Sequence, residues 1–213
     1  MENNNNSFSN FFINYKKAIY LLGILILIVG IVAFFNYQSQ TKANEEAAEV
    51  YSEWSKNFFE VKNSNELEND HIINLIDNYR SSGYTMLALL QKGNFEASEF
   101  KTQKAIETFT ILNNISKKNK NSKVFLIIST VNLARLNFDL KEYDVALKHI
   151  ESIPSISNQG YVNELIGDIF LKKEDIKKAD KYFEIAYQNY LENSDQTSAN
   201  LLKIKLAALD INL

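Results

Sequence analysis

The sequence predicts an all-α protein, with a single N-terminal transmembrane helix followed by an α-solenoid of antiparallel helix pairs. Three observations support this class. An uncharged apolar run extends from Ala18 to Phe35. The whole chain holds 1 proline and 6 glycines, and no segment shows the two-residue alternation of a strand. Small residues recur at a fixed spacing in the C-terminal half, as in stacked helical repeats. We divide the chain into a tail (1–17), a transmembrane helix (18–37), a membrane-proximal linker helix (38–63) and a helical repeat domain (64–213).

The apolar run is long enough to cross a bilayer. At about 1.5 Å per residue it spans ~27 Å, and Asn36 and Tyr37 extend it to about the thickness of a bilayer core. A cleavable signal peptide has a shorter apolar region of about 7–15 residues and a small-residue cleavage site, which does not follow here. A core helix of a soluble protein would need a polar face. We therefore expect an uncleaved anchor.

Lysines next to the run predict its orientation. Lys16 and Lys17 precede the span directly, whereas the chain beyond it becomes acidic at Glu45 and Glu46. Basic residues stay on the cytoplasmic side, so the short tail should be cytoplasmic and the large domain exported across the inner membrane. A wider window that includes Lys42 and Lys56 gives a tie, so the opposite topology stays open.

Charge and motifs argue against several classes of function. The net charge is −3, which argues against nucleic acid and against docking on anionic lipid. The one basic stretch, residues 116–123, is expected to be a solvated loop.

An enzyme is the hypothesis from another class, and it has little support. No phosphate-binding glycine motif occurs, and the two histidines, His71 and His149, lie far apart in the chain. Asp168, Glu174 and Asp175 are carboxylates close together in the sequence, and we expect them to be solvated acids at a turn. We therefore predict no catalytic residue, cofactor, metal or small-molecule substrate.

The linker helix carries one apolar stripe at helical spacing. Its members are Ala43, Ala47, Val50, Tyr51, Trp54, Phe58 and Val61. We expect the next helices of the domain to cover the stripe, although a dimer seam or a partner site would show the same pattern. Further helices are expected over about 70–79 and from Tyr84 onwards.

A repeat pattern is clearest after Tyr161. Its positions are Gly167, Phe170, Ala179, Phe183 and Ala186, which match the tetratricopeptide pattern of small and aromatic residues across two antiparallel helices. Small residues are required where the two backbones approach closely, and the aromatic rings fill the space on either side.

Two earlier copies precede this unit. Ala134 and Ala146 stand 12 residues apart, as Gly167 and Ala179 do, and lie 33 residues earlier. A degenerate copy keeps Ala105, with Gly93 as its one sign of a first helix. Its offset from the next copy is 41 residues, and we expect the excess in the lysine-rich loop. A last helix, over about 196–213, should cap the stack.

The first helices of such repeats line a groove in which peptides bind. Counting from Ala134 and Gly167, the side chains that face this predicted groove are Val131, Arg135, Phe138, Asp139, Glu164, Asp168, Leu171 and Lys172. The other possibility is that the leucine-rich C-terminal helix of the chain itself fills the groove.

The whole chain resembles the ancillary SecYEG translocon subunits, the YfgM-like proteins. The resemblance is carried by residues 75–79 leading to 83–89 (LIDNY, GYTMLAL), by 161–168 (YVNELIGD) and by 202–206 (LKIKL). It implies a cytoplasmic N-terminus, a periplasmic repeat domain and a non-catalytic role as an accessory or adaptor. The implied partners are the Sec translocon, a membrane-anchored periplasmic chaperone of the prolyl-isomerase type, and exported client proteins. A membrane-anchored scaffold for envelope assembly or cell division, or a protein-import receptor, would share the same architecture.

Overall fold

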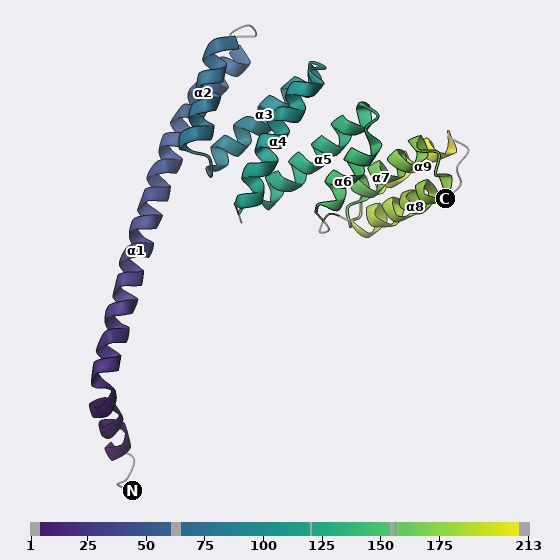
Figure 1. The fold of residues 1–213 in the computed structure, drawn as a ribbon. Helices are drawn as coiled ribbons and strands as arrows, with labels where there is room; N and C mark the ends of the chain where they lie inside the picture. The colour runs from purple at the N-terminus through teal and green to yellow at the C-terminus, as the bar shows by residue number, and fades with distance from the viewer. Residues whose placement is uncertain (1–4, 61–64, 120, 154–155, 157, 209–213) are drawn as a thin grey trace.

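The fold is all-helical, as the sequence predicts. The computed structural model describes residues 5–60, 65–119, 121–153, 156 and 158–208. Helices are the one kind of regular secondary structure in these residues, and they lie in the order α1 to α9. Figure 1 shows one long helix, α1, from which the other helices extend to one side as a stack of pairs.

Helix α1 (Asn5–Glu60) is continuous from the tail into the repeat domain. It therefore crosses the predicted boundaries at 17/18 and 37/38 without a break. Its apolar part faces away from the rest of the molecule, with Leu21 68% and Phe35 62% exposed. Among the described residues it is the one helix long and apolar enough to cross a membrane.

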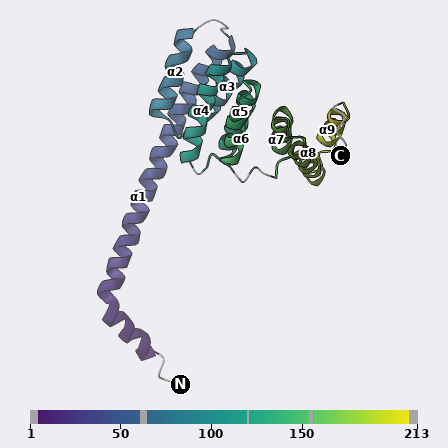
Figure 2. The same cartoon turned by 45° about the vertical axis from the view of Figure 1, so that its right-hand side comes forward.

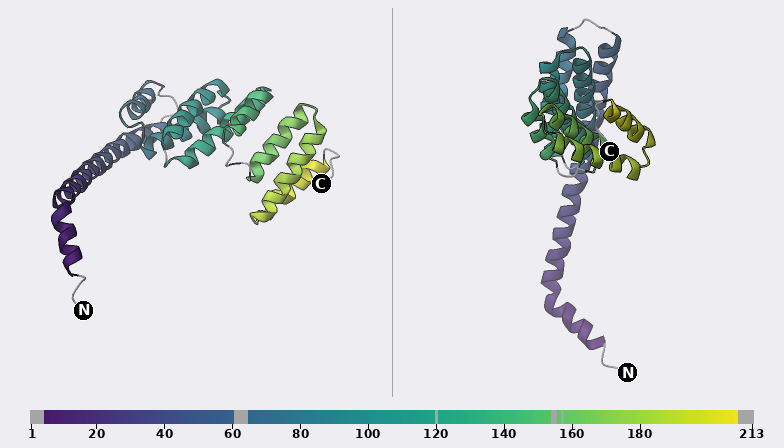
Figure 3. Two further views of the ribbon diagram at one scale, coloured as in Figure 1. Left: turned by 60° about the horizontal axis from the view of Figure 1, so that its bottom comes forward. Right: turned by 90° about the vertical axis from the view of Figure 1, so that its right-hand side faces the viewer.

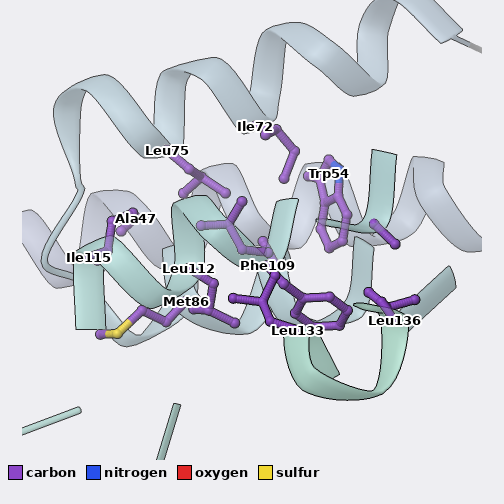
Figure 4. Close-up of a cluster of buried hydrophobic side chains, with 13 residues drawn as sticks. Ala47, Trp54, Ile72, Leu75, Met86, Phe109, Leu112, Ile115, Leu133 and Leu136 are labelled. Atoms are coloured by element: carbon purple, nitrogen blue, oxygen red, sulfur yellow. The ribbon is translucent and has the colours of Figure 1, made fainter. Parts of the chain in front are cut away.

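The upper part of α1 packs against α2 (Asn65–Asn78) and α3 (Gly83–Ser98). Ala47 and Trp54 from the predicted stripe are fully buried in a first hydrophobic core with Leu75 and Phe109. Figure 4 shows Trp54 of α1 among side chains from the neighbouring helices. The chain's own helices thus cover the described part of the stripe, and Trp54 is not available to a partner. Val61, the last predicted member of the stripe, lies outside the described residues.

Three antiparallel pairs follow one another along the stack. The pairs are α3 with α4 (Thr102–Lys118), α5 (Lys123–Asp139) with α6 (Tyr143–Glu151), and α7 (Gly160–Lys172) with α8 (Ile176–Glu192); α9 (Gln196–Ala207) then packs on α8. A second core lies between α5, α6 and α7, and a third between α7, α8 and α9. Figures 2 and 3 show the α7–α9 end of the stack farthest from α1.

Glycines lie where the paired helices approach most closely. A Cβ added to Gly167 would lie 2.6 Å from the Phe183 ring, and one added to Gly93 would lie 2.9 Å from the Phe109 ring. Both contacts join a glycine to the phenylalanine 16 residues later, so the degenerate copy keeps the geometry of the clear one. Ala134, Ala146, Ala179 and Ala186 are fully buried, whereas Phe170 is half-buried and stacks on Tyr182 with ring centroids 5.6 Å apart.

The turn inside each pair has one conformation. Phe100, Lys141 and Glu174 have φ of 57°, 64° and 63°, each just after the first helix of a pair. The amide of the following residue donates to a carbonyl five residues earlier, for example Asp175 to Phe170 at 3.0 Å. This is the Schellman ending of a helix, made here with residues other than glycine.

The structure differs from the sequence prediction in the place of the extra residues of the third copy, and it describes only part of the predicted last helix. The excess of the third copy does not lie in the lysine-rich loop, because α4 extends to Lys118 and α5 begins at Lys123. The excess comes from helix length, since α4 and α5 have 17 residues each, whereas α6 has 9 and α7 has 13. The predicted last helix ends at Ala207, and residues 209–213 lie outside the described part of the chain.

Candidate interaction surface on α5, α7 and α9

The first helices of the pairs form one row. Helix α3 contacts α5, and α5 contacts α7. Helix α9 packs on α8 and reaches α7 through a side chain, so it continues the row where a further first helix would lie. The surface of α5, α7 and α9 is therefore the candidate site for a bound peptide.

A charged cluster joins three helices at this surface. Lys205 Nζ of α9 donates to Glu164 Oε1 at 2.9 Å and to Asp168 Oδ2 at 2.7 Å, both on α7. Tyr190 of α8 donates its hydroxyl to the other oxygen of Glu164, at 2.9 Å. We call Glu164, Asp168, Tyr190 and Lys205 the α7–α9 cluster. It holds two carboxylates for one ammonium group.

Burial and pairing oppose each other in the α7–α9 cluster. Burial raises the pKa of Asp168, although its hydrogen bond to Lys205 acts in the other direction. Burial alone would lower the pKa of Lys205, but the hydrogen bonds to Asp168 and Glu164 reverse this effect and raise it. Burial and the Glu164 carboxylate raise the pKa of Tyr190. The hydrogen bonds therefore favour the charged form of Lys205, whereas burial favours the neutral form of Asp168.

Two further cations act on the cluster. The positive charge of Arg135 on α5 is close enough to lower the pKa of Tyr190, against the larger opposing effects. Lys172 acts in the same way on Asp168. The structure thus brings together four of the predicted groove residues: Arg135, Glu164, Asp168 and Lys172.

The remaining predicted groove residues differ in exposure. Asp139 is exposed, as are Arg135 and Lys172, and Leu171 is half-buried against the third core. Phe138 is half-buried and packs against Tyr143, with ring centroids 5.8 Å apart. Val131 is 5% exposed and belongs to the second core, so its placement in the groove was wrong. The count from Ala134 predicted that Val131 faces the groove, but Val131 lies in the core that α5 shares with α6 and α7.

The sequence prediction missed Tyr190 and Lys205. Both contact α7 from more than 25 positions away in the chain, a distance at which periodicity carries no information. One local signal was available: Lys205 lies next to Leu206, which is buried, on a helix expected to pack. The C-terminal helix therefore covers part of the predicted groove, at Glu164 and Asp168, and leaves Arg135 and Asp139 exposed.

The carboxylates considered for an enzyme serve separate structural roles. Asp168 belongs to the α7–α9 cluster. Asp175 caps α8 by accepting a hydrogen bond from the Lys178 amide at 3.2 Å. Glu174 is exposed at the turn with positive φ. Within the described residues, no group of three or more His, Cys, Asp or Glu could hold a metal ion.

The fold and this surface define a class, the helical-repeat proteins carried on one long apolar helix. The chain belongs to the tetratricopeptide repeat-like domain family, whose model matches residues 9–211. It is similar to the ancillary SecYEG translocon subunit of Aggregatibacter actinomycetemcomitans, with 24% identity over 196 residues that cover 91% of this chain and 89% of that protein. The resemblance to the ancillary SecYEG translocon subunits is thereby confirmed. None of the solved structures gives a significant match.

Proposed function

We propose that this protein is a non-catalytic accessory subunit of the Sec translocon, anchored in the inner membrane by α1. The observation that carries the proposal is the match along nearly the full length of both chains to an ancillary SecYEG translocon subunit. Tetratricopeptide-like repeats are modules for binding proteins, which favours an adaptor over an enzyme. The lysines before the span favour a cytoplasmic N-terminus and a periplasmic domain.

The row of first helices is the proposed contact for exported clients and for a membrane-anchored periplasmic chaperone. Arg135 and Asp139 on α5 and Lys172 on α7 are exposed charges of both signs, beside the half-buried Phe138 and Leu171. Such a surface binds an extended or helical peptide through paired charges and apolar contacts together. The part of α7 that Lys205 covers is available only if α9 moves aside.

Photocrosslinking in cells tests the translocon contact. A photoreactive residue is placed at Glu53, which is exposed on α1 next to the buried Trp54. We expect adducts with the protein-conducting channel. A matched probe at Lys181, exposed on α8, should give fewer of them. Adducts confined to envelope-assembly or division proteins would instead favour the scaffold function.

Thiol labelling tests the topology, because the chain has 0 cysteines. A single Lys141→Cys variant places one thiol at an exposed turn of the repeat domain. A membrane-impermeant maleimide should label it once the outer membrane is permeabilised. Labelling only after lysis of the inner membrane would contradict the periplasmic location and favour an import receptor.

A further inference from the structure

The connection between α4 and α5 lies beside α1, where that helix leaves the predicted membrane span. A cavity of about 500 Å³ is lined by Gln40 and Ala43 of α1 and, from the connection, by Lys118, Asn119 and Asn121. The Asn119 side-chain amide also donates to the Ser81 carbonyl at 3.0 Å, which ties the connection to the turn between α2 and α3. Lys118, Asn119 and Asn121 thus lie at the level of residues 40–43 of α1.

That level corresponds to the headgroups of the bilayer. Gln40 lies three residues beyond Tyr37, the end of the predicted span, or about 4.5 Å along the helix. Headgroups extend about 5–7 Å beyond the hydrocarbon core on each side. Figures 1 and 2 show the C-terminal end of α4 and the N-terminal end of α5 on the side of the domain nearest the N-terminal part of α1.

The adjoining ends of α4 and α5 carry a charge opposite in sign to that of the whole chain. No acidic residue occurs in the sequence between Glu107 and Asp139, whereas five basic residues lie in that interval, among them Lys117, Lys118 and Lys123. All three lysines are exposed, and none is in an ion pair among the described residues. The turn at the far side of the stack, residues 139–144, carries three acidic residues and one lysine.

An exposed apolar side chain accompanies the lysines. Val124, at the start of α5, is 66% exposed beside Lys123. Basic residues next to an exposed apolar residue are favoured at the surface of an anionic bilayer, where each lysine contributes about fivefold to the binding equilibrium.

We propose that Lys117, Lys118 and Lys123 bind the phosphate headgroups of anionic phospholipids in the leaflet from which α1 emerges. This contact holds the solenoid along the membrane surface, with the polar cavity beside Gln40 facing the headgroups. The proposal depends on the membrane span, but not on the translocon as partner. The proposal revises the expectation that the acidic net charge excludes anionic lipid, because a lipid headgroup interacts with the local surface charge and not with the net charge of the chain.

A fluorescent probe on the connection tests the proposal. The full chain with the single substitution Asn121→Cys is labelled and placed in nanodiscs that contain a lipid with a nitroxide on its headgroup. We expect stronger quenching in discs with anionic phosphatidylglycerol than in zwitterionic discs, and reversal of the difference at high salt. The same probe at Lys141, on the far side, should be quenched weakly in both.

Charge-removal variants decide whether the lysines are responsible. The triple variant Lys117→Gln, Lys118→Gln, Lys123→Gln should lose the dependence on anionic lipid, because its docking equilibrium falls about fivefold per lysine removed. A control with the same loss of charge, Lys104→Gln, Lys177→Gln, Lys181→Gln, should keep it, since these exposed lysines lie elsewhere. Equal quenching of the Asn121 and Lys141 probes, or a triple variant that responds to anionic lipid as the parent does, would overturn the proposal. Neither outcome affects the crosslinking from Glu53, so the two proposals fail separately.

Discussion

At the scale of single residues, the helix pairs depend on positions where a side chain must be absent. Gly167 and Gly93 allow a phenylalanine ring of the partner helix to lie against the backbone. The sequence indicated Gly167 because its spacing to Ala179 and Phe183 matches the tetratricopeptide pattern. Gly93 was harder to recognise, since the aromatic residues of its first helix do not follow the pattern.

Substitution of Gly167 by alanine should destabilise the third core. Its new Cβ would lie 2.6 Å from the Phe183 ring, so the two helices must separate. We expect a loss of about 1–3 kcal/mol in the free energy of unfolding, measured by urea denaturation of the full chain in detergent. Gly83→Ala is the control, because nothing lies within 4 Å of its Cβ position. Equal effects of the two substitutions would contradict the close approach.

A glycine at a turn position is expected to raise the stability of the chain. Glu174 has φ of 63°, a conformation that disfavours a Cβ by about 1–2 kcal/mol, of which part is offset by the larger entropy of an unfolded glycine. Glu174→Gly should therefore stabilise the chain by about 0.5–1 kcal/mol, and thermal unfolding of the variant measures this gain. Glu174→Ala keeps the strain and should give no such gain.

At the scale of elements, α9 is attached by apolar contacts and by one lysine. Leu202 and Leu206 are buried against α8, and Lys205 pairs with Glu164 and Asp168. Replacement of Lys205 by methionine keeps the length of the side chain but leaves two partly buried carboxylates without their partner. We expect the free energy of opening of α9, measured by amide hydrogen exchange, to fall by about 1–2 kcal/mol. Protection of α3 should stay unchanged; its loss would mean that the fold as a whole had weakened.

His149 on helix α6 makes the stability of the fold depend on pH. Burial, followed by the charges of Lys117 and Lys148, lowers the pKa of His149 below its ordinary value of 6.5. The unfolded chain then binds the proton more readily than the folded chain, so stability falls as the pH drops below about 6.5. His149→Gln should reduce the loss of stability between pH 7.5 and 5.5 in urea unfolding. An unchanged pH dependence would exclude this group as its source.

At the scale of the whole molecule, stability is divided among three cores along the stack. Repeat proteins open in units that follow such divisions. The first core gathers residues from α1 to α5, whereas the third joins α7, α8 and α9 at the free end. We expect amides of α7–α9 to exchange faster than those of α3 and α4. Uniform exchange along the stack would indicate a single cooperative unit.

The sequence was sufficient for the features that repeat or that depend on a long run of one residue type. The apolar segment of α1 and the 33-residue offset of Ala134 and Gly167 are of this kind. Only Glu164 and Asp168 of the α7–α9 cluster were predicted, because Lys205 and Tyr190 contact α7 through tertiary packing. Val131 was misplaced for a related reason. On a helix packed by neighbours on both sides, one turn decides between surface and core.

The continuity of α1 limits how the repeat domain can move relative to the membrane. Because the helix passes from the span into the first core without an interruption, no slack tether separates membrane and domain. The repeat stack can turn about the membrane normal, but it cannot drift to another height. A membrane-embedded partner therefore meets the repeat stack at one height above the bilayer. This restricts the search to two dimensions and raises the effective concentration of the surface without any additional contact.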